Sequence, residues 1–248
     1  MKLVTWNVQG ARPPLPDRLG PLLRRLEADV VVLTETAPHS REHLEPELAR
    51  AGWGHLEATA PAGHERGVLV ASREPLHRVD LPDLPVPHRA LLVALDTLGV
   101  SVLAAYAPLP GTLGPGSDAQ AVFWAWLRAE LRRRKDEPLV VAGDLNTCLA
   151  VDGTGRDLPG AAELRLVLGE GYRSAFRAVH PMSAAHSWWH HAGTAFRLDD
   201  VLVPPAVAVK AAEYHTELAG QCLAWDGRGR RPGVVLSDHA ALEVVLSA

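Results

Sequence analysis

The chain has 248 residues, of which 47% are hydrophobic, so it can bury a large core as one α/β or sandwich domain or as two small domains. Its formal net charge of -4 argues against a protein that coats nucleic acid non-specifically, because such proteins carry a basic excess. The 2 cysteines are too few for a disulfide framework or a thiolate zinc site, and no apolar run is long enough for a signal peptide or a membrane span. Since no linker or repeat divides the sequence, we expect one domain over residues 1–248, monomeric and cytoplasmic.

Short apolar runs rich in valine and leucine predict the strands. In chain order they cover residues 2–6, 28–34, 67–72, 90–97, 100–106, 138–144, 199–203, 234–236 and 241–246. Leucines at helical spacing predict a helix over 16–28, and further helices are predicted over 117–134, capped by Ser117, and over 161–171. Because strands outnumber helices and helices separate only some of them, the pattern favours a sheet-rich α/β or α+β layered domain.

Polar side chains stand where the predicted strands end or begin. The residues concerned are Asn7, Glu35, Tyr106, Asp144, Asn146, Arg197, Asp199, Asp238 and His239. Strands of a sheet can bring such ends to one rim, where loops hold functional groups on a rigid scaffold. Each of these residues, taken alone, is equally compatible with ordinary turn chemistry. Their number predicts a shared site at one rim.

The residue types at these positions indicate which chemistry the site supports. Their oxygen atoms suit Mg²⁺ or Mn²⁺ rather than structural zinc. Clustered carboxylates repel one another unless a cation offsets them, and such a site neutralises charge that develops on a phosphoryl group attacked by water. His239 exchanges protons near neutral pH, and Asp199 is the candidate partner that orients its ring. Tyr106 and the asparagines are candidates to donate hydrogen bonds to phosphate oxygens.

Six motifs occur together in the chain: TWNVQG, LTET, AYAP, GDLN, SWW followed by RLDDVLV, and SDH. Their order and approximate spacing resemble the endonuclease/exonuclease/phosphatase superfamily, which contains exonuclease III, abasic-site endonucleases, DNase I-like nucleases and inositol polyphosphate 5-phosphatases. The resemblance extends from Asn7 to His239. It implies a four-layer α/β sandwich of two packed, mostly antiparallel sheets flanked by helices, with the site at one rim.

The resemblance also implies roles for individual residues. Glu35 resembles the family's main metal ligand, with Asn7 and Asp238 beside it. Asp144 resembles the residue that orients or deprotonates the attacking water, or that protonates the leaving group. These two roles for Asp144 remain alternatives at the level of sequence.

Four further residues correspond to positions that handle the phosphate. Asn146 and Tyr106 resemble phosphate-positioning residues. His239, paired with Asp199, resembles the general base or the stabiliser of the transition state.

The SWW segment is similar to the exonuclease III branch, where an aromatic near this point accommodates the sugar at the target site. We therefore expect Trp188, Ser187 and Arg197 to contact substrate and Trp189 to pack into the protein. Base stacking on an aromatic platform contributes about 1 to 3 kcal/mol per base, which gives Trp188 a physical reason to lie near nucleic acid.

The chain departs from the nuclease pattern in several places. Asp200 stands where the family often has an aromatic residue, and it is expected to be an extra ligand or exposed. The lysine and asparagine that abasic-site endonucleases often carry after their ETx-like and YAP-like motifs are missing. These differences weaken a specific prediction of abasic DNA as the substrate. Loop residues Asp17, Asp152 and Asp157 are expected to be solvated.

Together these features predict a metal-dependent phosphodiester hydrolase that acts on nucleic acid, DNA in first place, by attack of activated water. The alternative is a phosphatase or phosphodiesterase for small or inositol-type phosphates, which the acidic net charge permits. A non-catalytic binding protein on the same scaffold would have lost its site carboxylates and histidine, and this chain retains them.

A basic groove with exposed aromatic residues would distinguish a nuclease from an enzyme for small phosphates. The candidate residues for such a groove are Arg12, Arg66, Arg89 and the arginines within 228–231.

Overall fold

The computed structural model of the protein describes residues 1–112, 118–190, 193–226 and 233–247. Its helices are α1 (Leu15–Leu26), α2 (Pro38–Arg50), α3 (Ala119–Arg133), α4 (Ala161–Gly169) and α5 (Ala175–Val179). Short 3₁₀ turns cover Asp96–Leu98 and Ala150–Asp152. No helix in these ranges is both long and apolar enough to span a bilayer.

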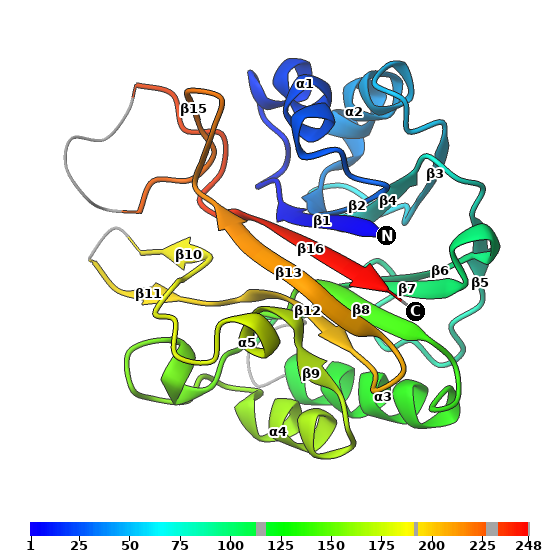
Figure 1. The fold of residues 1–248 in the computed structure, drawn as a ribbon, viewed down its shortest axis with the longest axis vertical. Coiled ribbons are helices and arrows are strands. Elements are labelled where there is room, and N and C mark those ends of the chain that lie inside the picture. The colour runs from blue at the N-terminus through cyan, green and yellow to red at the C-terminus, as the bar shows by residue number, and fades with distance from the viewer. Residues whose placement is uncertain (113–117, 191–192, 227–232, 248) are drawn as a thin grey trace.

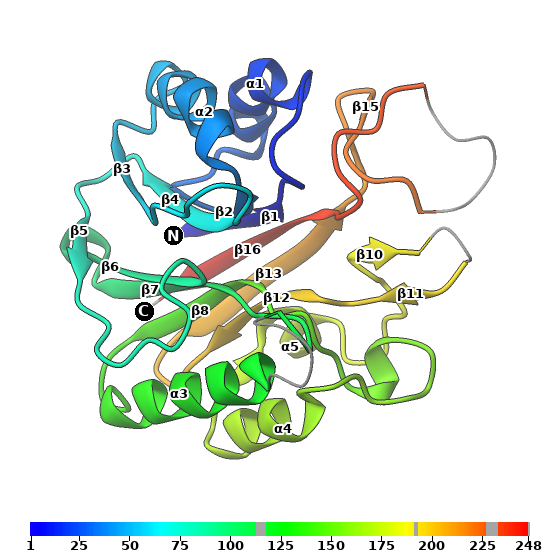
Figure 2. The same ribbon diagram turned by 180° about the vertical axis from the view of Figure 1, so that it is seen from behind.

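Two six-stranded sheets form the body of the protein. Sheet A has the order β13 (Ala208–His215), β16 (Ala241–Ser247), β1 (Lys2–Asn7), β2 (Val30–Thr36), β4 (Gly67–Ser72) and β3 (His55–Ala58). Sheet B has the order β5 (His77–Val79), β6 (Ala90–Leu95), β7 (Val100–Tyr106), β8 (Leu139–Asp144), β12 (Asp199–Val203) and β9 (Arg173–Ser174). Two small hairpins, β10 (Trp188–Trp189) with β11 (Ala195–Phe196) and β14 (Glu217–Leu218) with β15 (Gln221–Cys222), lie at one end of the molecule (Figures 1 and 2).

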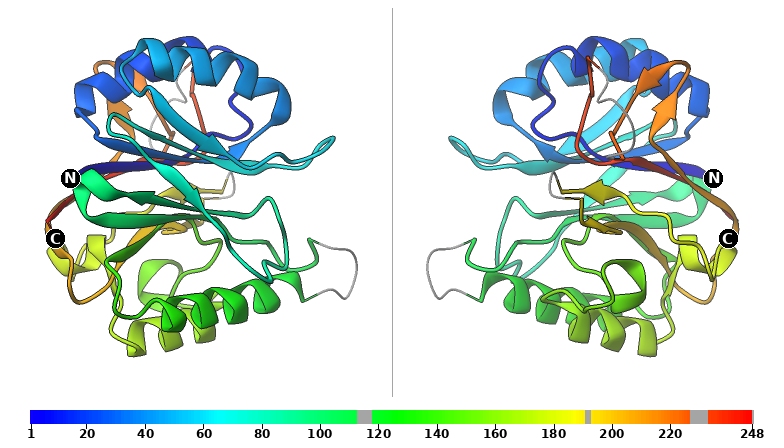
Figure 3. Two further views of the ribbon diagram at one scale, coloured as in Figure 1. Left: turned by 90° about the vertical axis from the view of Figure 1, so that its right-hand side faces the viewer. Right: turned by 90° about the vertical axis from the view of Figure 1, so that its left-hand side faces the viewer.

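The sheets stack face to face between two helical layers. Helices α1 and α2 cover the outer face of sheet A, and α3 and α4 cover the outer face of sheet B (Figure 3). This arrangement confirms the predicted four-layer α/β sandwich. Each sheet is mixed, with one parallel pair and antiparallel pairing elsewhere.

The parallel pairs determine where the site lies. β1 runs parallel to β2, and β7 runs parallel to β8, because helices α1 and α3 carry the chain back to the start of the next strand. Parallel strands end at the same edge of their sheet, and the two pairs face each other across the sandwich through contacts of β1 with β8 and of β2 with β7. Four strand ends from two sheets therefore meet at one rim.

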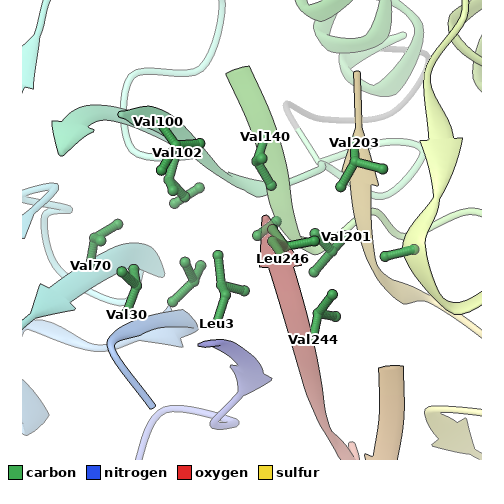
Figure 4. Packing of buried hydrophobic residues seen from close by; sticks show 14 of the residues in the cluster. Leu3, Val30, Val70, Val100, Val102, Val140, Val201, Val203, Val244 and Leu246 are labelled. Carbon is green, nitrogen blue, oxygen red and sulfur yellow. The ribbon is translucent and has the colours of Figure 1, made fainter. Parts of the chain in front are cut away.

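Buried side chains fill all three spaces between the layers. The valine-rich cluster between the sheets includes Leu3, Val30, Val102, Val140 and Val244 (Figure 4). Alternate residues of the same strands point to the helices instead, as Val31 and Leu33 do in β2. Burial on both faces explains why these strands read as continuous apolar runs in the sequence.

The structure differs from the predicted elements at a few positions. Residues 234–236 are not a strand, and the polar segment 38–50 forms helix α2. The exposed edge strand β13 also lacked an apolar signal. The predicted cap Ser117 lies outside the described residues, and Asp118 caps α3 by accepting a hydrogen bond from the Ala121 N–H at 3.2 Å.

Candidate active site

Glu35 reaches the rim from a distorted position in β2. The register between β2 and β4 shifts between Thr34 and Thr36, and Glu35 there has a left-handed φ of 56°. A bulge of this kind turns a side chain out of the regular strand alternation, at a conformational cost that the surrounding pairing sustains. The predicted metal ligand is thus held by a specific local distortion.

A hydrogen-bonded network joins the four ends of the parallel pairs. The Asn7 amide donates from Nδ2 to Glu35 Oε1 at 3.0 Å and to Asp144 Oδ2 at 2.9 Å. The Tyr106 hydroxyl donates to Glu35 Oε1 at 3.0 Å. Asn7 and Glu35 come from sheet A and the other two residues from sheet B, so the network connects the sheets.

Asp199 and His239 form a buried pair beside this network. His239 Nδ1 lies 2.6 Å from Asp199 Oδ2, and the two residues are 5% and 0% exposed. The carboxylate therefore fixes the orientation of the imidazole, as the sequence predicted for this pair. The second carboxylate oxygen, Asp199 Oδ1, is buried without a hydrogen-bond partner in the described part of the chain.

The electrostatic environment shifts two pKa values strongly. Burial and, after it, the nearby Asp199 carboxylate together raise the pKa of Asp144 to about 7, against the lowering influence of His239. Burial lowers the pKa of His239, but the charge and the hydrogen bond of Asp199 outweigh it and raise that pKa to about 10. Perturbed carboxyl and imidazole groups in contact are typical of acid–base sites.

Asn146 and Asp238 lie at the edges of this cluster. The Asn146 backbone N–H donates to Asp144 Oδ1 at 2.9 Å, and its side-chain Nδ2 donates to the Ala107 carbonyl at 2.8 Å. Asp238 accepts a hydrogen bond from Trp188 Nε1 at 3.1 Å, and its Oδ1 lies 3.9 Å from His239 Nε2. Half-buried Trp188 stacks on Phe196 with ring centroids 6.0 Å apart.

Ser187 and Arg197 do not line the same surface as the cluster. Ser187 is fully buried and accepts backbone hydrogen bonds from Leu198 and Asp199, so it supports the site from behind. The buried Arg197 guanidinium pairs with Asp152 at 2.6 Å. Neither position matches the substrate contact expected from sequence.

Two aspartates differ from their predicted environments. Asp152 is buried and paired with both Arg177 and Arg197, so the expectation of a solvated loop residue is wrong. Asp200 is also buried, with an oxygen 3.9 Å from Arg197, so it is not exposed. The Asp199 and Asp200 side chains point to opposite sides of β12, which explains why only one of them joins His239.

Sequence reasoning missed several supporting residues. The Ser237 hydroxyl donates to the Asn7 carbonyl at 2.7 Å and accepts from the His239 N–H at 3.1 Å. Trp6 Nε1 donates to the His239 carbonyl at 2.8 Å. Arg89, in contrast, is one of the groove candidates named from the sequence, and its guanidinium lies 4.0 Å from the centre of the Tyr106 ring. The SDH motif itself contained the signal for Ser237, since a serine before Asp-His can bond two backbone groups.

The donor set fits a hard divalent cation. One ligand atom each from Asp144, Asp199 and His239 lie within 4.8 Å of one another, and Asp199 Oδ1 has no partner among the described residues. Glu35 adds a further carboxylate through its bond to Asn7. Carboxylate and amide oxygens are the ligands that Mg²⁺ and Mn²⁺ prefer, so the residues present fit such an ion.

The chain belongs to the Endonuclease/Exonuclease/phosphatase family, whose family model matches residues 4–239. It is therefore an enzyme of a class made up of hydrolytic nucleases and phosphatases. No curated protein sequence matches the chain.

Solved structures share the whole fold. An AP endonuclease from Archaeoglobus fulgidus superposes with a TM-score of 0.80 at 20% identity. The 3′ phosphatase NExo from Neisseria, bound to a product DNA hairpin, gives 0.77 at 23% identity, and the 3′-5′ exonuclease NExo from Neisseria meningitidis gives 0.76 at 25% identity. In all three comparisons 100% of each chain is covered.

Proposed function

We propose that this chain is a single-domain, monomeric nuclease that hydrolyses phosphodiester bonds of DNA with Mg²⁺ or Mn²⁺. The observation that carries the proposal is the contact of Asn7 with both Glu35 and Asp144, next to the buried Asp199–His239 pair. A phosphoryl group placed there would contact Asp144 for proton transfer and the hydrogen-bonded imidazole of His239. The Glu35 carboxylate would hold a cation beside it.

The metal would be held by the predicted ligands Glu35, Asn7 and Asp238, and Asp199 Oδ1, which has no partner in the described ranges, is a further oxygen donor beside them. A bound Mg²⁺ or Mn²⁺ supplies positive charge that offsets the charge developing on the phosphoryl oxygens. The Tyr106 hydroxyl and the Asn7 amide keep Glu35 in place before substrate arrives. Such preorganisation removes the cost of reorienting these groups during the reaction.

Asp144 and His239 divide the proton chemistry. A carboxyl whose pKa is raised to about 7 can hold a proton at one stage and release it at another near neutral pH, so Asp144 is assigned acid–base exchange with the water or the leaving oxygen. His239, with its pKa raised to about 10, keeps a proton on Nε2 while Nδ1 bonds Asp199. It is therefore assigned the stabilisation of a phosphoryl oxygen rather than removal of a proton.

Cationic side chains near the rim support a nucleic acid as the substrate. Arg89 lies against Tyr106, and the Arg66 guanidinium lies 3.4 Å from the position that a Cβ of Gly10 would take, close to the end of β1. Arginines at separate places beside the rim can contact successive backbone phosphates, whereas a small phosphate would occupy only one position. Arg12 is exposed, and residues 228–231 lie outside the described part of the chain.

The similar solved structures, an AP endonuclease and a 3′-5′ exonuclease among them, also favour DNA as the substrate. A third similar structure is a 3′ phosphatase bound to a DNA hairpin. A phosphatase acting on a DNA end or on a small phosphate is therefore the second candidate. Such a phosphatase would use the same side chains as the nuclease. The two candidates differ in whether the substrate continues beyond the scissile phosphate.

The test is a matched panel of single-stranded, duplex, abasic and 3′-phosphorylated DNA, RNA and soluble inositol phosphates, each with Mg²⁺, Mn²⁺ or EDTA. We expect metal-dependent cleavage of DNA that falls at least about a hundredfold in Glu35→Ala, as for loss of a group that stabilises transition-state charge. Glu137→Ala, which removes an exposed carboxylate beside Arg134, is the matched control and is expected to retain activity. Phosphate release without chain cleavage would replace the nuclease by the phosphatase, and activity in Glu35→Ala equal to that of the wild type would refute the assigned site.

A further inference from the structure

A cavity of about 180 Å³ lies behind the site, among α4, α5, β12 and the loop that follows β8. Its lining includes Leu164 and Leu168 from α4, Leu202 from β12, and Leu145 and Leu149 from the loop. These five leucines make most of the wall apolar. A cavity of about 150 Å³ with such walls accommodates benzene, so this one has room for a slightly larger molecule.

Charged residues also line this cavity. Arg197 is 4% exposed and pairs with Asp152 at 2.6 Å, while Asp200 lies 3.9 Å from the same guanidinium. Arg177 donates to Asp152 at 2.8 Å and to several backbone carbonyls. Two guanidinium groups thus face two carboxyl groups, and their formal charges balance.

One polar atom of this group is left over. Arg197 Nη1 is buried and has no hydrogen-bond partner in the described ranges. Buried guanidinium nitrogens are normally all satisfied, because an unpaired buried donor costs free energy. Because Arg197 also lines the cavity, a hydrogen-bond acceptor bound inside the cavity would satisfy this nitrogen.

The cavity opens to solvent on one side. Val151 and Pro181 both line it, and Val151 is 68% exposed while Pro181 is also on the surface. The Arg177 guanidinium donates to the carbonyls of both residues, which holds the two sides of the opening together. An apolar rim of this kind admits a small molecule without unfolding of the surrounding elements.

We propose that this cavity binds a neutral small molecule with an apolar body slightly larger than benzene and one carbonyl oxygen that accepts a hydrogen bond from Arg197. The ligand is neutral because the surrounding charges already balance, and a buried extra charge without a partner would be unfavourable. It is apolar over most of its surface because leucines form the largest share of the lining, with Thr147, Cys148 and Ser174 as its uncharged polar side chains.

Such a ligand would act on the catalytic groups through the chain segments that it touches. Leu145 and Thr147 line the cavity on both sides of Asn146, whose backbone bonds Asp144. Asp200 lines it directly after Asp199. This site goes beyond the proposed nuclease activity, and its occupancy is measurable without any substrate.

The binding test uses acetophenone as the probe, with toluene and benzoate as matched molecules lacking the acceptor or carrying a charge. Saturation-transfer NMR titrations of the full chain give the dissociation constants, and thermal unfolding of each variant verifies its fold. We expect saturable binding of acetophenone at least about tenfold tighter than that of toluene or benzoate, as for one added hydrogen bond to a charged donor. Leu168→Trp, which fills the cavity, should abolish binding.

Leu166→Trp is the control, because Leu166 lies on the same helix, is 46% exposed and does not line the cavity. It should bind acetophenone within about twofold of the wild type. If Leu168→Trp does not fold, Val151→Trp at the opening replaces it and should weaken binding at least about tenfold. Absence of saturable binding to the wild type, equal binding to the filled variant, or tighter binding of toluene or benzoate would each overturn the proposal.

Discussion

At the scale of single residues, buried serine hydroxyls hold the geometry of the proposed catalytic pair Asp199 and His239. Ser187 Oγ accepts the N–H groups of Leu198 and Asp199 at 2.9 and 3.0 Å, and its carbonyl accepts the Ala240 N–H at 2.7 Å. One residue therefore fixes the backbone at Asp199 and next to His239. We interpret Ser187 as a positioning residue that sets the distance between the members of this pair.

Ser187→Ala tests this role. It leaves two buried N–H groups without an acceptor, which should cost about 1 to 3 kcal/mol of unfolding free energy. Displacement of Asp199 should lower kcat by about tenfold to a hundredfold with little change in KM, since misplacement of catalytic groups acts on the transition state. Urea unfolding and steady-state kinetics across pH measure both effects.

Ser183→Ala is the matched control, because within the described ranges that hydroxyl accepts a hydrogen bond from the Ala185 N–H alone. It should leave kcat and its pH profile unchanged. If Ser187→Ala loses stability but keeps the wild-type kcat and pH profile, Ser187 has a structural role and does not position the pair.

Sequence could predict which residues gather at the rim but not how each side chain is used. Asn7, Glu35, Tyr106 and Asp144 end strands, and the strand order brings them together as expected. The substrate contact predicted for Arg197 does not match the structure, because its partners are Asp152 and Asp200. Pairing between buried charges from separate segments leaves no local pattern in the sequence.

At the scale of elements, the close approach of β7 and β8 depends on a glycine. Gly143 in β8 has a φ of 147°, and a Cβ there would lie 1.9 Å from the Ala105 carbonyl oxygen in β7. The next residue in each strand is a site residue, Asp144 or Tyr106. The parallel pairing that places these two side chains therefore excludes any side chain at position 143.

Gly143→Ala should separate the two strands and destabilise the protein by at least about 3 kcal/mol, which is the range of severe steric substitutions. Gly169→Ala is the control, because, its own helix backbone and chain neighbours apart, no atom of the described residues lies within 4 Å of its Cβ position at the end of α4. That change should be neutral or stabilise by up to about 1 kcal/mol. Chemical denaturation compares the two, and equal stability would contradict the close approach.

Elements with a strong apolar pattern were predictable, and those without one were not. Strands that pack against the other sheet on one face and against helices on the other are buried on both faces, so they read as valine-rich runs in the sequence. In α2 only Ser40, Leu44 and Leu48 are buried, and Pro46 lies inside the helix, so its sequence gives little helical signal. The run 234–236 is apolar without being a strand.

At the scale of the whole molecule, the site joins the two sheets. Glu35 and Asn7 belong to sheet A, whereas Asp144 and Asp199 belong to sheet B. Three carboxylates from separate strands are thus gathered by folding at one rim. His239 offsets the charge of Asp199, whereas Glu35 and Asp144 share the Asn7 amide and repel each other when both are ionised. A cation that offsets this repulsion would stabilise the fold, so the stability of the sandwich should depend on divalent metal.

We expect Mg²⁺ to raise the midpoint of thermal unfolding. A ligand that binds only the folded state at about 100 times its dissociation constant stabilises by about 2.7 kcal/mol. For a domain of this size that corresponds to roughly 5 to 10 °C. Glu35→Gln should remove most of the increase, because it deletes a ligand charge, whereas Glu137→Gln should preserve it, since Glu137 lies on the surface beside Arg134. Calorimetry with Mg²⁺ or EDTA measures the difference, and an equal increase in both variants would show that the cation binds somewhere other than at the junction of the sheets.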